Sequence, residues 1–265
     1  MVFSSIFYLF SHFLVQFLSI GGLKASPVKP ISVKIGVHQP IQDSLVKHIY
    51  ISFDDGPILG TSNCIDICLR HQLAATFFEV GLHQSRSKQG QKLYQQILQN
   101  ENLFAICNHS FSHAYGDYLN FYHHPNEALA DFLHAKEILQ PNNNISRLPG
   151  NNAWNTIEVK RASGLVRPLV HQLDSAGFNI VGWDMEWRFN KKGKPVQSPE
   201  AIVALVDSLL KLNQTVSKNH LVLLMHDHMF RAPADSIKLD KMVALLKQNP
   251  YYRFEKLTQY PGLKN

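Results

Sequence analysis

Short apolar segments alternate with longer amphipathic segments between residues 48 and 250, and this alternation predicts an order of strands and helices. Apolar runs of four to six residues bounded by polar residues are typical of buried strands. We expect strands over residues 48–53, 75–80, 103–107, 145–148, 178–183 and 220–225. We expect helices over residues 62–71, 90–100, 125–139, 165–176, 199–212 and 236–247.

Capping and turn residues support several of these boundaries. Pro125 stands in the first turn of its helix, where proline is tolerated, and Gly177 follows the end of another helix. Ser198 is a good N-cap for the helix after it, and Pro250 stops the last helix. Strands that alternate with helices of this length predict βα units around a parallel sheet. Six or seven such units fit either a barrel or an open doubly wound sheet.

The first residues have the pattern of a secretory signal peptide. No Lys, Arg, Asp or Glu occurs from Met1 to Leu23, and an apolar run over residues 6–20 precedes small residues that end at Ala25. This order is typical of a cleaved signal, so we expect residues 1–25 to be removed and the protein to be exported, to the periplasm or the medium. An uncleaved anchor is the alternative, although the run is short for a span of about 20 residues.

Proline spacing separates an arm from the main domain. Residues 26–46 contain three prolines and have no strong hydrophobic period, so we expect an N-terminal arm there. We expect a single α/β domain over residues 47–265. No later segment is apolar enough over a sufficient length for a transmembrane helix, so no membrane anchor is expected after cleavage.

Composition and charge exclude several classes of protein. Hydrophobic residues make up 45% of the 265 residues and charged residues 17%, which is ordinary for a globular domain. The formal net charge is +6, but no stripe of Lys and Arg of the kind that binds nucleic acid is present. A modest positive charge is compatible with an anionic cell-surface polymer. No glycine-rich phosphate loop follows the first expected strand, which argues against a dinucleotide or nucleotide-triphosphate enzyme.

The three cysteines are too few for a disulfide framework. Cys64 and Cys68 lie one turn apart on an expected helix, and we expect both to be small buried apolar side chains. One bridge to Cys107 remains open in an oxidising compartment.

Candidate chemistry lies at the carboxyl ends of the expected strands, where parallel α/β folds form their sites. Each of these polar groups is common alone, and Asp-Gly is ordinary turn chemistry. Their occurrence at five strand ends, in order, indicates one functional site. The groups are Asp54 and Asp55, His109 and His113, Arg147, Asp184, and His226.

This combination of residues supports metal-assisted hydrolysis. Two imidazoles with the spacing of His109 and His113 and one carboxylate bind Zn²⁺ and leave positions open for water and substrate. The adjacent Asp54 and Asp55 can divide the roles of base and ligand, because neighbouring residues at a strand end point in different directions. A histidine then serves as general acid near neutral pH, with a carboxylate as its partner.

The motifs resemble those of the NodB-homology polysaccharide deacetylases, carbohydrate esterase family 4, over about Ile49 to Thr258. The matching segments are Ser52–Pro57, His109–His113, Arg147–Gly150, Asp184–Trp187 and Leu224–His226. The resemblance implies a distorted (β/α)7 barrel with about seven strands. It implies catalysis with a bound metal ion, with Zn²⁺ as first choice and Co²⁺ or Ni²⁺ as alternatives.

The resemblance also implies roles for individual residues. Gly150 departs from the family pattern, which has an aromatic residue there; its backbone N–H can still stabilise an oxyanion, and we expect Trp154 to cover that side of the groove. We expect the aromatic loop over residues 115–124 to pack beside the metal. The implied roles are catalytic base for Asp54, metal ligand for Asp55, His109 and His113, orientation of the base for Arg147, support of the acid for Asp184, general acid for His226, and groove wall for Trp187.

The implied reaction removes N-acetyl groups from a polysaccharide that contains N-acetylglucosamine, such as peptidoglycan, an exopolysaccharide or chitin-like oligomers. Two alternatives remain at this point. One is a non-catalytic glycan-binding protein on a deacetylase scaffold. The other is a deacylase of a different, small N-acylated substrate. No nucleic-acid partner is expected.

Overall fold

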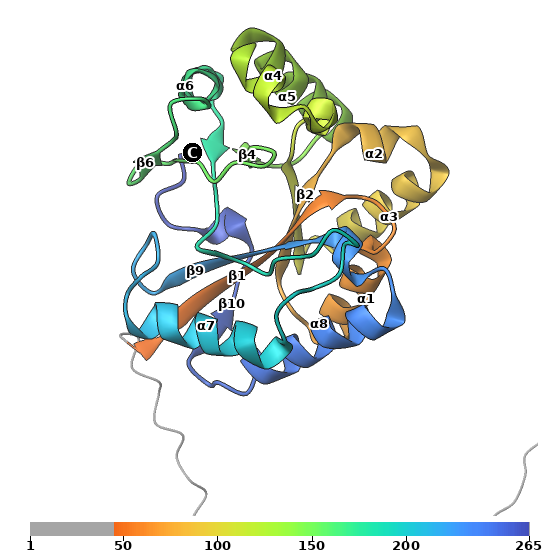
Figure 1. The fold of residues 1–265 in the computed structure, drawn as a ribbon, viewed down its shortest axis with the longest axis vertical. Helices are drawn as coiled ribbons and strands as arrows, with labels where there is room; N and C mark the ends of the chain where they lie inside the picture. The colour runs from red at the N-terminus through yellow and green to blue at the C-terminus, as the bar shows by residue number, and fades with distance from the viewer. Residues whose placement is uncertain (1–44, 265) are drawn as a thin grey trace, which may run out of the picture. The chain divides into compact units, whose positions relative to one another are not determined.

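In the computed structural model, which describes residues 45–264, the sheet is built around strand β1 (Lys47–Gly56). This strand pairs in parallel with β2 (Ala75–Glu79) and β9 (His220–His226), and its first residues also pair with β10 (Tyr252–Phe254). Residues from Ile49 to Asp54 are buried, as expected for a central strand covered on both faces. Figure 1 shows β1 and β9 side by side through the middle of the domain.

The rest of the sheet extends from β2 and β9. The strand order is β6-β5-β7-β4-β3-β2-β1-β9-β8, and β10 pairs with β1 beside this path. All pairs are parallel except those that β5 makes with β6 and β7. The remaining strands are β3 (Phe104–Asn108), β4 (Ile145–Ser146), β5 (Trp154–Asn155), β6 (Lys160–Arg161), β7 (Asn179–Ile180) and β8 (Met185–Glu186).

Helices cover the outer face of the sheet, and Figure 1 places α1, α7 and α8 on one side of the domain and α4, α5 and α6 on the other. Helices α7 and α8 pack on each other, as do α5 and α6. The helices are α1 (Thr61–Arg70), α2 (Gly81–Arg86), α3 (Lys88–Leu98), α4 (Tyr118–His123), α5 (Pro125–Leu139), α6 (Arg167–Ser175), α7 (Pro199–Lys211) and α8 (Pro233–Leu246).

The two faces of β1 have different roles. Ile49, Ile51 and Phe53 point outward into the largest apolar cluster, which α1, α3, α7 and α8 complete. Tyr50 points to the opposite face and belongs to a separate inner cluster. Because side chains alternate along a strand, Asp54 shares the inner face with Tyr50. The outer face therefore stabilises the fold, and the inner face is free to carry polar chemistry.

The observed elements agree closely with the expected ones. The helix predicted over residues 125–139 has those bounds, and α1, α3, α6 and α7 lie within a few residues of their predictions. The sheet forms an α/β half-barrel, which confirms the predicted distorted barrel; within residues 45–264 no ladder joins β8 to β6. Helix α8 begins at Pro233, three residues before the predicted start, because proline fits the first turn.

Several short elements were not predicted from the sequence. The strands expected over 145–148 and 178–183 pair over only two residues each, in β4 and β7. The hairpin β5–β6 and strands β8 and β10 were missed because two- or three-residue strands carry no readable period. Helix α4 forms in the segment expected to be a loop.

Cys64, Cys68 and Cys107 are free and buried, so the two cysteines of α1 are apolar core residues as predicted and the open bridge to Cys107 does not form. In residues 45–264 no helix is both long and apolar enough to cross a membrane. The predicted signal peptide and nearly all of the predicted arm lie outside the described residues.

Candidate active site

The register of the parallel strands brings the predicted site residues to one level. Asp54 on β1 lies opposite His226 on β9. On the other side, the ladder from β2 through β3 to β4 aligns Glu79, Asn108 and Ser146. His109 and Arg147 directly follow Asn108 and Ser146, so they project at the same edge. Side chains that are far apart in the sequence thus converge at the carboxyl end of the sheet.

Asp55, His109 and His113 form a group that can hold a metal ion. Asp55 Oδ1 lies 3.0 Å from His113 Nε2 and 3.6 Å from His109 Nε2, and the ligand atoms all lie within 4.8 Å of one another. Asp55 Oδ1 is buried and has no hydrogen-bond partner. His109 Nδ1 lies 3.0 Å from the carbonyl oxygen of Arg147, which can only accept, so Nδ1 carries the proton and Nε2 offers a lone pair to the site.

The charge state of this group suits a cation. Burial raises the pKa of Asp55, but the adjacent His109 and His113 lower it by more, and the net result is a pKa well below the usual range. Asp55 is therefore ionised at neutral pH. One carboxylate and two imidazoles are the donor set of an open zinc site, so the residues present fit the metal that the resemblance implies.

Backbone geometry holds the two metal-site loops in uncommon conformations. Asp55 has φ 75° and His113 has φ 53°, both in the left-handed region that side chains other than glycine rarely adopt. Asp131 Oδ1 on α5 accepts hydrogen bonds from the backbone N–H groups of Phe111 and Ser112. Ser110 Oγ accepts another from the N–H of His113. These bonds compensate the cost of the strained backbone and fix the second histidine.

Asp54 is held in one orientation by Arg147. Both side chains are buried, and Arg147 Nη1 donates to Asp54 Oδ1 at 2.7 Å. The guanidinium also donates to Ser52 Oγ and to the carbonyl oxygens of Val181 and Gly182, so its nitrogens are well satisfied. Asp54 Oδ2 lies on the other side, 3.6 Å from His109 Nε2. The arrangement presents one oxygen of the Asp54 carboxyl group to the site.

Asp184 has different partners from those that the sequence predicted. Its carboxylate accepts hydrogen bonds from the backbone N–H groups of Val216 at 2.6 Å and Val222 at 2.7 Å. Val222 lies four residues before His226 on β9, which is about 13 Å along a strand. Asp184 therefore supports the backbone and does not reach the predicted acid.

Glu186 occupies the place predicted for Asp184. Its Oε1 lies 4.0 Å from His226 Nδ1, a buried atom with no hydrogen-bond partner. The register explains why Glu186 reaches the acid. Glu186 on β8 pairs with Leu224, two residues before His226, whereas Asp184 lies beside Val222, four residues before it. Sequence reasoning missed Glu186, although it directly precedes the motif tryptophan.

A cavity of about 240 Å³ opens over these residues. Tyr118 packs edge-on against His113, with ring centroids 5.7 Å apart, so the aromatic loop does lie beside the metal site. Gly150 lines the cavity as predicted, and a Cβ there would lie 3.3 Å from the Tyr118 ring. The aromatic and apolar lining is completed by Trp183, Phe189 and Leu224.

Two predicted groove residues are in the core instead. Trp154 is fully buried, packs on Tyr260 and donates its indole N–H to Asn152. Trp187 is also fully buried and packs on Phe230. Both corrections have one cause: the chain around each tryptophan joins the sheet and turns the ring into the interior. Neither ring lines the cavity above the metal site.

A buried acid pair lies behind the site and was not predicted. Glu79 and Asp227 flank Gly56, where a Cβ would lie 2.6 Å from Glu79 Oε1 and 2.5 Å from Asp227 Oδ2. Burial and repulsion from Asp55 and Asp54 raise the pKa of Asp227 to about 8, and burial and repulsion from Asp227 raise that of Glu79 well above its usual value. The pair therefore keeps protons at neutral pH and adds little negative charge beside the metal site. The sequence feature that could have indicated this pair is Glu79, a charged residue within the apolar segment over residues 75–80.

Comparisons with known proteins agree with the fold and the site. A family model described as polysaccharide deacetylase matches residues 42–150. A peptidoglycan-N-acetylglucosamine deacetylase of Bacillus cereus is 25% identical over 186 residues, covering 68% of this chain and 60% of the relative. YheN, a candidate polysaccharide deacetylase of Bacillus subtilis, is 24% identical over 209 residues, covering 77% of this chain and 65% of the relative. The chain thus spans less than two thirds of these relatives.

A solved structure shows the same architecture. The catalytic domain of a peptidoglycan N-acetylglucosamine deacetylase from Eubacterium rectale superposes with a TM-score of 0.59 at 25% identity, covering 83% of this chain and 92% of that chain. These similarities support a NodB-homology polysaccharide deacetylase, as the motifs indicated.

Alanine substitution of Asp55, His109 or His113 should weaken zinc binding, because each substitution removes a direct ligand. The loss of affinity should exceed the roughly 10–100-fold that follows removal of a residue that only hydrogen-bonds a ligand. Zinc affinity of the purified protein, measured with a competing chelator, tests this. His123→Ala is a matched control, because His123 is exposed on α4 outside the group. Wild-type affinity in any of the three variants would remove that residue from the ligand set.

Asp184 should make stability depend on pH. Burial raises its pKa from 3.8 to about 6, against the two backbone hydrogen bonds, which lower it. Because the folded state binds the proton more tightly, the group's contribution to the free energy of unfolding is lost as the pH rises from about 4 to about 6, by at most about 3 kcal/mol. Urea unfolding across this range should show the wild type losing stability relative to Asp184→Asn as the pH rises. Parallel pH curves would contradict the shift.

Proposed function

We propose that this protein is a metal-dependent hydrolase that removes N-acetyl groups from a polysaccharide containing N-acetylglucosamine. The observation that carries the proposal is the position of Asp54. Its buried carboxylate is fixed by Arg147, adjoins the Asp55, His109 and His113 group, and faces His226 across neighbouring strands. A base, an acid and a metal-ligand set at one cavity are what amide hydrolysis requires.

Asp55, His109 and His113 would hold the metal ion, with Zn²⁺ preferred and Co²⁺ or Ni²⁺ as alternatives. When bound, such an ion lowers the pKa of water and polarises the scissile carbonyl group. Asp54 accepts the proton of the attacking water on Oδ2, while Arg147 keeps Oδ1 occupied and the carboxylate ionised.

His226 protonates the leaving amine. Its Nδ1 is turned toward Glu186 Oε1, so Nε2 is the nitrogen that faces the cavity. The Glu186 carboxylate lies beside the ring, and Phe189 packs edge-on against it at 4.9 Å and restricts its orientation. Water adds across the C–N bond, so the products are acetate and a free amino sugar. The backbone N–H of Gly150 is the candidate donor to the oxyanion.

The rings at the cavity support a sugar substrate. Tyr118, Trp183 and Phe189 supply flat apolar surfaces around the polar centre, and sugar rings carry apolar C–H faces that pack on such surfaces. The names of the Bacillus cereus and Eubacterium rectale relatives point to peptidoglycan. Exopolysaccharide and chitin-like oligomers remain in the substrate class. Export directed by residues 1–25 is part of the proposal, because such polymers lie outside the cytoplasm.

Purified full-length chain supplied with zinc should release acetate from N-acetylglucosamine oligomers or from peptidoglycan. Asp54→Asn should lower the rate by about 10²–10⁴-fold, because no carboxylate accepts the proton. Asp66→Asn on the exposed face of α1 is the matched control, and circular dichroism checks that each variant folds. Glycan binding without acetate release would favour a non-catalytic glycan-binding protein. Release only from small N-acylated compounds would favour a deacylase of a small substrate.

Glu186, rather than Asp184, should support the acid. Glu186→Gln should lower kcat, because the carboxylate beside His226 Nδ1 is lost. Asp184→Asn should leave kcat nearly unchanged, because its side chain is bound to the backbone away from His226. His226→Gln should keep zinc affinity and slow turnover by about 10²–10⁴-fold. A loss of kcat in Asp184→Asn with wild-type kcat in Glu186→Gln would restore the role that the sequence predicted.

A further inference from the structure

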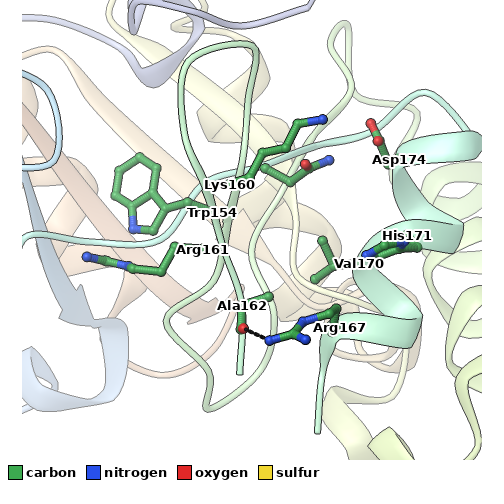
Figure 2. Close-up of a pocket in the computed structure, with 9 residues that line it drawn as sticks. Trp154, Lys160, Arg161, Ala162, Arg167, Val170, His171 and Asp174 are labelled. Carbon is green, nitrogen blue, oxygen red and sulfur yellow. Dashed lines mark hydrogen bonds between the residues drawn. The ribbon is translucent and has the colours of Figure 1, made fainter. Parts of the chain in front are cut away.

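A second cavity, of about 320 Å³, lies between the β5–β6 hairpin and helix α6. None of the catalytic or metal-site residues lines it. Figure 2 shows Lys160 on the hairpin facing α6, and Arg167, His171 and Asp174 on the helix side. Arg161, the next residue of the hairpin, points the other way, toward Trp154.

The cations of this cavity are not neutralised by the protein. Lys160, Arg161 and Arg167 make no ion pair within 4.0 Å anywhere in residues 45–264; the hydrogen bond in Figure 2 joins Arg167 to the carbonyl oxygen of Ala162. The one carboxylate in the lining, Asp174, is bound by the ammonium group of Lys264, whose hydrogen bond lowers its pKa. The cavity is therefore positively charged at neutral pH.

A buried amide adds a free donor. Asn155 on β5 lines the cavity and is only 4% exposed. Its Nδ2 lies near the Asp174 carboxyl group and helps to lower the pKa of that group, but it makes no hydrogen bond of good geometry. Solvated surface charges would account for the lysine and the arginines alone. They do not account for an unpaired donor in the interior, because buried polar groups normally have partners.

Hydrogen bonds at Asn152 link the lining of this cavity to that of the catalytic pocket. Asn152 Oδ1 accepts hydrogen bonds from the backbone N–H of Trp183 at 3.2 Å and from Arg161 Nη2 at 3.5 Å. Trp183 lines the catalytic cavity. Trp154, in the second cavity, is four positions after Gly150, in the first, so at most about 14 Å of chain lies between them. A glycan of a few sugar units is long enough to occupy both.

The geometry points to an acidic glycan as the substrate: the cavity between the β5–β6 hairpin and α6 binds a carboxylate or phosphate group on the same chain whose N-acetyl group enters the catalytic pocket. The inference rests on the proposed function. Guanidinium groups bind both anions through paired hydrogen bonds, and Lys160 and Asn155 supply further donors. Arg161, between the two cavities, extends the positive charge toward the catalytic pocket.

The test compares matched acidic and neutral ligands. The full-length zinc-loaded chain carrying His226→Gln, which slows turnover, is titrated with N-acetylglucosamine oligomers, with hyaluronan oligosaccharides of similar length, and with N-acetylglucosamine oligomers that bear 6-phosphate groups. The acidic ligands should bind at least about tenfold more tightly, because charge-assisted hydrogen bonds are stronger than neutral ones. The preferred acidic ligand distinguishes carboxylate from phosphate.

Lys160→Gln combined with Arg167→Gln should abolish most of this preference and its dependence on salt, since two cations facing the cavity are removed. Arg86→Gln combined with Lys88→Gln removes the same charge from exposed positions at α2 and α3 and should leave the preference intact. Arg161 is left unchanged because its bond to Asn152 supports the catalytic cavity.

Each outcome tests either the acidic-glycan site or the proposed deacetylase function. Equal binding of acidic and neutral oligomers, or a preference that survives the loss of Lys160 and Arg167, overturns the acidic-glycan site. A preference lost equally in the control pair reduces it to net charge and also overturns it. A pocket-dependent preference in a wild-type protein that releases no acetate would support the site and refute the proposed function.

Discussion

The buried ion pair between Arg147 and Asp54 is the interaction on which the site depends. Two charges without water are stable only when their hydrogen bonds are satisfied, and here the guanidinium binds Asp54, Ser52 and two carbonyl oxygens. These bonds join β1, the segment after β4 and the segment after β7. Loss of one partner would leave a buried charge unpaired, at a cost of about 3–5 kcal/mol. The base is therefore oriented by the same contacts that hold three parts of the sheet together.

Charge balance explains how several carboxyl groups can share a small volume. Asp54 is compensated by Arg147, and Asp55 faces two histidines and the place of a cation. Behind them, burial and repulsion keep Glu79 and Asp227 protonated at neutral pH. The acid pair thus adds little negative charge behind the carboxylates of Asp54 and Asp55. Positive charge lies farther along the surface, around Lys160 and Arg167, where a long anionic substrate would extend.

The parallel register converts local sequence motifs into one site. Neighbouring strands end at the same edge, so a polar residue at the end of each apolar segment reaches its counterparts without special loops. Where a residue must turn toward its partner, the chain adopts strained backbone, as at Asp55 and His113. Hydrogen bonds that Asp131 and Ser110 accept from backbone N–H groups hold the loop of the second histidine. Rigid strands and anchored loops together keep the metal group in place.

The sequence by itself determined the order of the elements and which residues meet at the carboxyl end of the sheet, among them the Asp55, His109 and His113 group and the pair of Arg147 and Asp54, because apolar periodicity is local and the motif residues directly follow strands. Tertiary structure alone decided the partner of His226 and the walls of the pocket. The register of β8 against β9 brings Glu186, and not Asp184, to the acid. Strand pairing also decides which aromatic side chains reach the cavity. Trp183 and Phe189 line it, whereas Trp154 and Trp187 are buried. A strand of two residues shows no period, so the direction of its side chains follows only from what it pairs with.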